Sequence, residues 1–109
     1  METITAEELK KKIDGYDVMV LLDVRPAEDY QQAHLKGAIS LPFSRNMQQE
    51  ARAFLKKEDD IIVYADSDVV EEAFRLLKKN GYPKLRAVLG GMSSWRAGGF
   101  EVTNKVSMG

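Results

Sequence analysis

The sequence predicts an α/β domain with three layers, in which a mostly parallel central sheet carries helices on both faces. Segments such as residues 19–24 and 61–64 are dense in Val, Leu and Ile without alternation, which is typical of strands covered on both sides. Segments with apolar residues at helical spacing lie between them, and right-handed crossovers then place helices on both faces. The length of 109 residues suits one domain. We therefore expect a single domain over residues 1–109, with a core from about residue 4 to 102.

The first predicted helix begins after Thr5. The run Thr-Ala-Glu-Glu at residues 5–8 is a capping box, in which the Thr5 hydroxyl accepts from the amide of Glu8 and the Glu8 carboxylate accepts from the amide of Thr5. Apolar residues recur at helical spacing as far as Ile13, and the Asp-Gly pair that follows ends the helix. This helix should therefore pack on the sheet by one face.

Four strands and three further helices are expected along the rest of the chain. The strands are predicted at residues 19–24, 38–41, 61–64 and 87–89. The helices are predicted at residues 26–32, 48–55 and 69–80, the last with a broad apolar stripe and an Asn80-Gly81 stop. Residues 103–109 have little apolar content, and we expect them to fray.

Composition excludes several classes of function. Sixteen Lys and Arg oppose seventeen Asp and Glu, so no net field attracts nucleic acid or anionic lipid, and neither is expected as a partner. The chain has no cysteine, which removes thiolate nucleophiles and Cys-based metal sites. The longest apolar run, residues 18–22, is far too short to span a membrane, and residues 1–3 lack the basic start of a signal peptide. We therefore expect a cytoplasmic protein.

Two loops are the best places for a site. In an open parallel sheet, ligands bind beyond the carboxyl ends of the strands, where loops lead into helices. Residues 23–26 follow the strand predicted at 19–24, and residues 65–68 lie between the strand at 61–64 and the longest predicted helix. The second loop is the natural position for a ligand.

Two signatures in the sequence carry a family resemblance. Asp-Val-Arg-Pro-Ala-Glu-Asp-Tyr at residues 23–30 precedes Ala-His-Leu-Lys-Gly-Ala-Ile-Ser-Leu-Pro at residues 33–42. Gly-Gly-Met-Ser-Ser-Trp at residues 90–95 precedes Arg-Ala-Gly-Gly-Phe at residues 96–100. Together, in this order and spacing, they resemble the opening and closing signatures of the rhodanese homology domain, over nearly the whole chain.

The resemblance implies a sulfurtransferase site that is incomplete in this chain. Family members use a cysteine after the central strand to take a sulfane sulfur from a donor and pass it on as a persulfide. Ala65 stands at that position, Asp68 stands where glycine is frequent, and Val70 stands where many active members have arginine. The site loop implied by the resemblance comprises Ala65, Asp66, Ser67, Asp68, Val69 and Val70.

The chemistry of these residues opposes sulfur transfer. The methyl group of Ala65 cannot replace a thiolate nucleophile. Asp66 and Asp68 would repel thiosulfate or phosphate, by ~1 kcal/mol per charge pair near 4 Å in water and about 4 kcal/mol at an effective dielectric of 20. We favour a simpler role for both acids, as caps or dipole partners of the helix after the loop. A divalent-cation site at residues 66–68 is disfavoured because no third ligand is nearby.

The remaining polar candidates are expected to be structural. Ser67 lacks an adjacent base, since the only histidine, His34, belongs to a different loop, where its ring should bond to backbone. Asp23 and Arg25 are the strongest supporting candidates, as an internal ion pair that braces the site loop. Trp95 is expected to pack against the sheet.

Two hypotheses about function follow. The first is a catalytically inactive rhodanese-like domain that serves as a binding or regulatory module, with no cofactor or metal and with an unidentified protein or a small sulfur-containing ligand as partner. The second is a sulfurtransferase whose nucleophilic cysteine has been replaced by Ala65. A tyrosine-phosphatase-like relative would need a cysteine and an arginine that this loop lacks. A redesigned chain stripped of all its cysteines remains possible on sequence alone.

Overall fold

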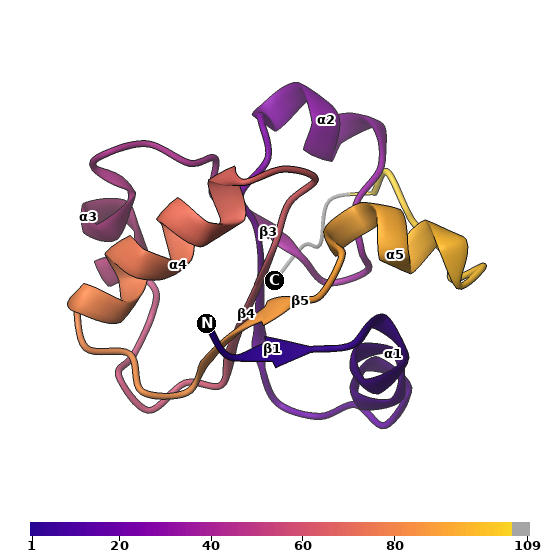
Figure 1. The fold of residues 1–109 in the computed structure, drawn as a ribbon, viewed down its shortest axis with the longest axis horizontal. Coiled ribbons are helices and arrows are strands. Elements are labelled where there is room, and N and C mark those ends of the chain that lie inside the picture. The colour runs from indigo at the N-terminus through magenta and orange to yellow at the C-terminus, as the bar shows by residue number, and fades with distance from the viewer. Residues whose placement is uncertain (106–109) are drawn as a thin grey trace.

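The computed structural model describes residues 1–105 and contains a five-stranded parallel sheet with the order β1-β5-β4-β2-β3 (Figure 1). The strands are β1 (Thr3–Ile4), β2 (Val20–Asp23), β3 (Ile39–Ser40), β4 (Ile61–Tyr64) and β5 (Leu85–Val88). Every pairing is parallel, and β4 lies at the centre between β5 and β2. The predicted fold class is therefore confirmed.

Five helices surround this sheet. They are α1 (Ala6–Asp14), α2 (Ala27–Gln32), α3 (Met47–Arg52), α4 (Val69–Lys79) and α5 (Gly91–Ala97). Figure 1 shows α3 and α4 on one side of the sheet and α1 and α5 on the other, with α2 at the top of the view. Among residues 1–105, no helix has the length and apolarity that crossing a bilayer would require.

The central strand explains the missing alternation in the sequence. Ile61 and Val63 belong to the apolar cluster under α3 and α4, whereas Ile62 and Tyr64 belong to the cluster under α1 and α5. All four side chains are fully buried. Both faces of β4 are covered, so an apolar residue is required at every position.

Most predicted boundaries hold within a few residues. The bounds of β4 and the start of α4 are as predicted, and the capping box at Thr5 and Glu8 is present, with both hydrogen bonds 3.0 Å long. The backbone amide of Thr5, followed by its side chain, lowers the pKa of the Glu8 carboxyl group. The strand predicted at 87–89 instead begins at Leu85, because Leu85 pairs with Ile61, while Leu89 lies outside the strand and is exposed.

Two elements were not predicted. Strand β1 has only two residues and is fixed by pairing with β5, so it has no pattern of its own. Helix α5 starts at the second of two glycines and contains two serines, which are poor helix formers, so its sequence resembles a loop.

The expected fraying of residues 103–109 is wrong for its first part. Thr103 forms an antiparallel bridge with His34, with both backbone hydrogen bonds 2.8 Å long. The backbone carbonyl of Lys105 also contacts the ring of His34. Backbone pairing holds these residues although they offer little apolar surface. The rest of that prediction, residues 106–109, lies outside the described residues.

Candidate functional site

The two loops chosen from the sequence meet at one edge of the sheet. Strands β2 and β4 are neighbours, and Asp23 pairs with Tyr64 at their carboxyl ends. Residues 24–26 therefore lead into α2 beside residues 65–68, which lead into α4. Parallel topology brings together segments that are about forty residues apart in the sequence.

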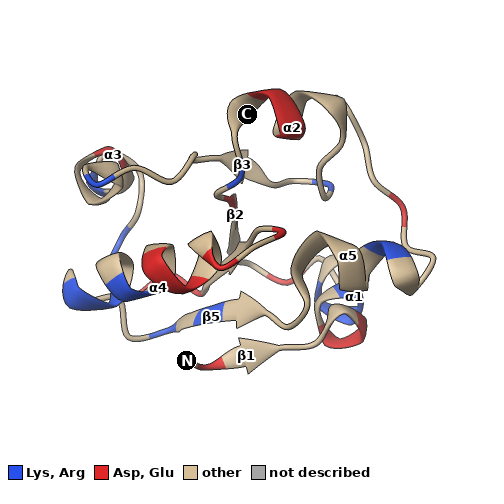
Figure 2. Cartoon of the chain, turned by 45° about the horizontal axis from the view of Figure 1, so that its top comes forward, with Lys and Arg blue, Asp and Glu red and all other residues tan. Residues whose placement is uncertain are grey.

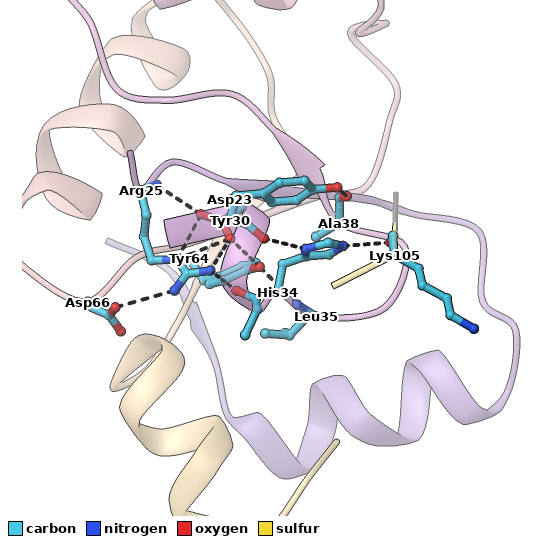
Figure 3. A network of polar contacts seen from close by, with 10 residues as sticks. Asp23, Arg25, Tyr30, His34, Leu35, Ala38, Tyr64, Asp66 and Lys105 are labelled. Atoms are coloured by element: carbon cyan, nitrogen blue, oxygen red, sulfur yellow. Dashed lines mark hydrogen bonds and ion pairs between the residues drawn. The ribbon is translucent and has the colours of Figure 1, made fainter. Parts of the chain in front are cut away.

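A buried ionic network lies at this edge (Figure 3). The Asp23 carboxylate is fully buried and accepts from Arg25 through Nε at 3.0 Å and Nη2 at 2.7 Å. The backbone amide of Arg25 donates to the same carboxylate at 3.0 Å, and the Tyr64 hydroxyl donates to it at 2.6 Å. The interpretation of Asp23 and Arg25 as an internal ion pair is confirmed by these contacts.

The same network extends to the segment after α2. Arg25 Nη2 donates to the carbonyl of Ala33 at 2.5 Å, and the amide of Leu35 donates to the Tyr64 hydroxyl at 3.1 Å. The guanidinium carbon of Arg25 also lies 5.7 Å from the centre of the Tyr64 ring. Bidentate pairing and full hydrogen bonding offset the cost of burying these charges.

Electrostatics keep Tyr64 neutral and Arg25 charged. Burial raises the pKa of Tyr64, and the neighbouring Asp23 charge raises it further, so the phenol stays neutral. Burial alone would lower the pKa of Arg25, but its hydrogen bond and ion pair with Asp23 outweigh burial and raise it. The network is therefore a neutral phenol and a paired cation around one buried carboxylate.

The site loop is held from the opposite side by α5. The amide of Met92 donates to the carbonyl of Ala65 at 3.2 Å. Gly91 has a φ of 56°, and a Cβ placed on it would lie 1.8 Å from that same carbonyl oxygen. Only glycine permits this approach, which gives a physical role to one residue of the Gly-Gly signature.

The loop itself is an exposed turn that leads into α4. The amide of Val70 donates to the carbonyl of Ser67 at 3.2 Å, and that of Glu71 donates to Asp68 at 3.0 Å. Among the hydrogen bonds formed within residues 1–105, none is donated by the amides of residues 66–68. These exposed amides therefore have no acceptor within the described part of the chain.

The acids of the loop do not cap α4, contrary to one expectation. Asp68 is the residue before the helix, but it makes no side-chain cap hydrogen bond because its backbone is already helical, with φ −60° and ψ −12°. Asp66 is half exposed and instead lies 3.7 Å from Arg25 Nη1. Within residues 1–105, no group of three His, Cys, Asp or Glu side chains is placed to hold a metal ion.

The other residues from 65 to 70 differ in exposure. Ala65 is buried, Ser67 is exposed, and Val69 and Val70 are partly buried against the apolar cluster under α4. A valine packed in this way brings no charge to the loop. Residues 65–68 form the turn after β4, and Val69 and Val70 are the first two residues of α4.

His34 and Trp95 lie outside the loop and are structural. The His34 ring is buried, with Nδ1 2.7 Å from the carbonyl of Tyr30 and Nε2 3.0 Å from that of Lys105, and it stacks on the Tyr30 ring at 3.7 Å. Trp95 is buried, and its Nε1 donates to the carbonyl of Glu101 at 2.9 Å. Both interpretations are confirmed.

Sequence reasoning missed Tyr64 and Gly91 as parts of the site. A tyrosine that ends a fully apolar strand is a usable signal, because a buried hydroxyl needs a hydrogen-bond partner. The sequence marked Gly91 only as one of two adjacent glycines in the closing signature, and not as a contact of Ala65. The contact with Ala65 depends on tertiary structure.

Comparison with known proteins decides the family. The sequence model of the Rhodanese-like domain matches residues 5–98. The chain belongs to the rhodanese-like domain family. The resemblance drawn from the two signatures is thus confirmed.

Curated relatives include longer proteins that this chain matches over part of their length. A putative sulfur carrier protein, YrkF of Bacillus subtilis, is 30% identical over 92 residues, covering 84% of this chain and 49% of that protein. The adenylyltransferase and sulfurtransferase MOCS3-1 of Zea mays is 28% identical over 98 residues, covering 84% of this chain and 21% of that protein. The chain thus spans about half or less of the length of these two relatives.

Solved structures share the fold over nearly the whole chain. The crystal structure of the Alr3790 protein from Anabaena has a TM-score of 0.87 at 28% identity, covering 95% of this chain and 94% of that one. The thiosulfate sulfurtransferase from Pseudomonas aeruginosa has a TM-score of 0.84 at 28% identity, covering 97% of this chain and 20% of that one. This rhodanese-like domain is therefore related to sulfur carriers and sulfurtransferases.

Proposed function

We propose that this rhodanese-like domain does not carry sulfur and serves as a binding or regulatory module, with residues 65–70 as its recognition surface. The observation that supports the proposal is Ala65 at the nucleophile's position, followed by Asp66 and Asp68 in the same loop. A protein or a small sulfur-containing ligand is the proposed partner. No cofactor or metal is part of the proposal.

The chemistry of persulfide formation supports this proposal. A thiolate must attack the outer sulfur of thiosulfate, the sulfur–sulfur bond must break, and sulfite must leave. The side chain of Ala65 has no lone pair with which to attack. The sequence contains no cysteine elsewhere that could take its place.

Charge around the loop supports it further. Asp66 and Asp68 are exposed beside the open amides, and Glu71 lies in the first turn of α4. An incoming thiosulfate would meet these carboxylates before it reached the backbone donors. Repulsion of this kind weakens anion binding by about 1 kcal/mol per charge pair in water near 4 Å.

The alternative is a sulfurtransferase in which alanine has replaced the nucleophile. One observation favours it, namely that the supporting structure is complete: Asp23, Arg25 and Tyr64 are fully bonded, and the carbonyl of Ala65 is held by α5. A cysteine at position 65 would inherit this fixed backbone. The two functions therefore differ in what Ala65→Cys should do.

The deciding experiment measures sulfur on the protein and turnover in three chains. The unchanged chain, Ala65→Cys and the control Ser67→Cys are each incubated with thiosulfate, and the intact mass is followed for a gain of about 32 Da, one sulfur atom. Ser67→Cys places a thiol in the same loop at an exposed position away from the nucleophile's place. Cyanide is then added to measure thiocyanate formation.

We expect no sulfur adduct on the unchanged chain, and turnover by Ala65→Cys no greater than that by Ser67→Cys. A sulfur adduct on the segment after Tyr64 of the unchanged chain would overturn the proposal. Turnover by Ala65→Cys well above that by Ser67→Cys would instead establish the sulfurtransferase reading.

We also propose that residues 1–109 form one domain and that this module works in the cytoplasm. Near-neutral net charge and the absence of a long apolar run in the sequence support that location. Fractionation of cells that express the tagged protein tests it, with recovery in the membrane or exported fraction as the contrary result.

A further inference from the structure

A groove lies between α4 and the segment that follows β3, away from the residues of the site loop. It has a volume of about 290 Å³. One wall is the stripe of α4 at residues 72, 75, 76 and 79, which share a helix face, and the other is the segment from Phe43 to Arg45. Phe43 and Leu76 are partly buried on the main apolar cluster and form its floor.

Three cations line this groove without a partner in the described chain. Arg45, Arg75 and Lys79 are exposed, and within residues 1–105 none of them lies within 4.0 Å of a carboxylate or makes a side-chain hydrogen bond. One carboxylate, Glu72, lines the groove at the end nearer the site loop. The cations therefore outnumber the acids at this surface by three to one.

Neighbouring cations, by contrast, are committed to the fold. Arg52 Nη2 donates to Asn80 Oδ1 at 3.4 Å, and Lys57 donates to the carbonyl of Asn80, at the end of α4. Lys57 Nζ also lies 4.5 Å from the centre of the Tyr82 ring. These two side chains donate hydrogen bonds to Asn80 at the end of α4, so the cations of the groove are not needed for that purpose.

Compensation of the helix dipole does not account for all three free cations. It explains Lys79, which lies in the last turn of α4. Arg75 lies before that turn, and Arg45 belongs to a different segment. Figure 2 shows the resulting polarity, with acidic residues at the start of α4 and basic residues at its far end, on the side of α3.

We propose that this groove binds an acidic segment of a protein partner. Carboxylates of the partner pair with Arg45, Arg75 and Lys79, and one apolar side chain between them packs on Phe43 and Leu76. The inference rests on the proposed binding function and names the chemistry of the partner. It adds a second contact surface to the site loop.

The shape of the groove favours a peptide over a single anion. The stripe from residue 72 to residue 79 extends for roughly 10 Å along the helix, at 1.5 Å per residue. An extended peptide covers that length with about three residues. A free phosphate would engage only one end, and Glu72 interrupts the positive surface that a nucleic acid backbone would follow.

Fluorescence anisotropy with a labelled peptide tests the proposal. The probe is a short peptide with one central phenylalanine and glutamates on both sides of it. The control peptide has lysines in place of the glutamates. Titrations use the full chain near 0.15 M salt, where the screening length is about 8 Å and distant charges contribute little. A single-stranded RNA oligomer and inorganic phosphate serve as competitors.

Two matched variants locate the binding surface. Lys79→Glu reverses a charge inside the groove, and Lys78→Glu makes the same change at the adjacent residue of α4, outside the groove. Both side chains are exposed, so both variants should fold, which thermal unfolding verifies. We expect Lys79→Glu to weaken peptide binding by about tenfold or more, and Lys78→Glu to change it by less than about twofold.

Three outcomes would overturn the inference. The first is no binding of the acidic peptide, and the second is an equal loss of peptide affinity in both variants. The third is displacement of the labelled peptide by RNA at a concentration lower than that of unlabelled peptide needed for the same displacement. The sulfur measurement described above is independent of this one. If the peptide fails to bind while the unchanged chain stays free of sulfur, only the groove is refuted. A sulfur adduct on the unchanged chain would refute the proposed function instead.

Discussion

The network beneath the site loop and the loop itself differ in burial and in hydrogen bonding. Below, Asp23 and Tyr64 are fully buried and are hydrogen-bonded to each other, to Arg25 and to the amide of Leu35. Above, Asp66 and Asp68 are exposed, and the amides of residues 66–68 donate to no acceptor in the described chain. The buried network holds the backbone at the ends of β2 and β4 in place, whereas the loop exposes charged side chains and backbone amides to solvent.

This difference shows that support and reactivity are separable in this fold. The backbone of Ala65 is held by contacts that do not involve its side chain, and its methyl group is buried in the apolar cluster under α3 and α4. Met92 and Gly91 contact the carbonyl of Ala65 and not its methyl group. A rhodanese-like scaffold can therefore stay rigid when its nucleophile is missing.

The largest effect is expected from Asp23→Ala. Loss of the carboxylate leaves the Arg25 guanidinium buried without its counter-ion, which costs about 3–5 kcal/mol of unfolding free energy. Urea denaturation followed by circular dichroism measures it. If the variant does not fold, Asp23→Asn, which keeps the volume, allows the same measurement. A loss below about 1 kcal/mol would show that the network does not brace the loop.

Tyr64→Phe should have an intermediate effect. Removal of the hydroxyl leaves the buried amide of Leu35 without an acceptor and takes one donor from Asp23, at a cost of about 1–3 kcal/mol. Tyr16→Phe is the matched control, since Tyr16 is 88% exposed. The same urea titration applies, and equal stability of the two variants would contradict the expectation.

Alkaline pH should lower the free energy of unfolding gradually, because Tyr64 is buried. Its pKa is raised in the folded chain, so the unfolded chain releases the proton first, and the associated stability is present below pH 10 and lost above it. The loss should reach about 1.4 kcal/mol per pH unit above ~10. Unfolding at pH 9, 10 and 11 should show this slope in the unchanged chain and a shallower one in Tyr64→Phe.

The smallest effect is expected from Asp66→Asn. Asp66 is half exposed, and its ion pair with Arg25 is long, at 3.7 Å. Asp23 already neutralises the charge of Arg25, so the free energy of unfolding should change by less than about 0.5 kcal/mol. Thermal unfolding at low and moderate salt measures it. A loss that approaches the effect of Asp23→Ala would place Asp66 within the supporting network and erase the distinction between the two regions.

The sequence was sufficient for the elements whose patterns are local. The capping box at Thr5 and the stripe of α4 depend on neighbours within one or two helical turns, so their positions were predicted closely. The family signatures located the site loop for a different reason, since they preserve order and spacing. Asp23 and Arg25 were found because they lie at a strand end inside one of those signatures.

What the sequence did not reveal depends on contacts between distant residues. Strand β1 exists because β5 pairs with it, and Gly91 matters because Ala65 approaches it in space. The prediction that Asp66 or Asp68 caps α4 was wrong because the preceding turn already has helical angles at Asp68. Such angles follow from how the loop is attached at both ends.

The sheet order also constrains how the chain folds. Thr3 and Ile4 pair with Ala87 and Val88, so β1 cannot pair until β5 has been synthesised. Closure of such a long segment is slow, since chain entropy is lost before the pairing compensates for it. Strand β1 of a nascent chain therefore lacks its partner until β5 has been synthesised.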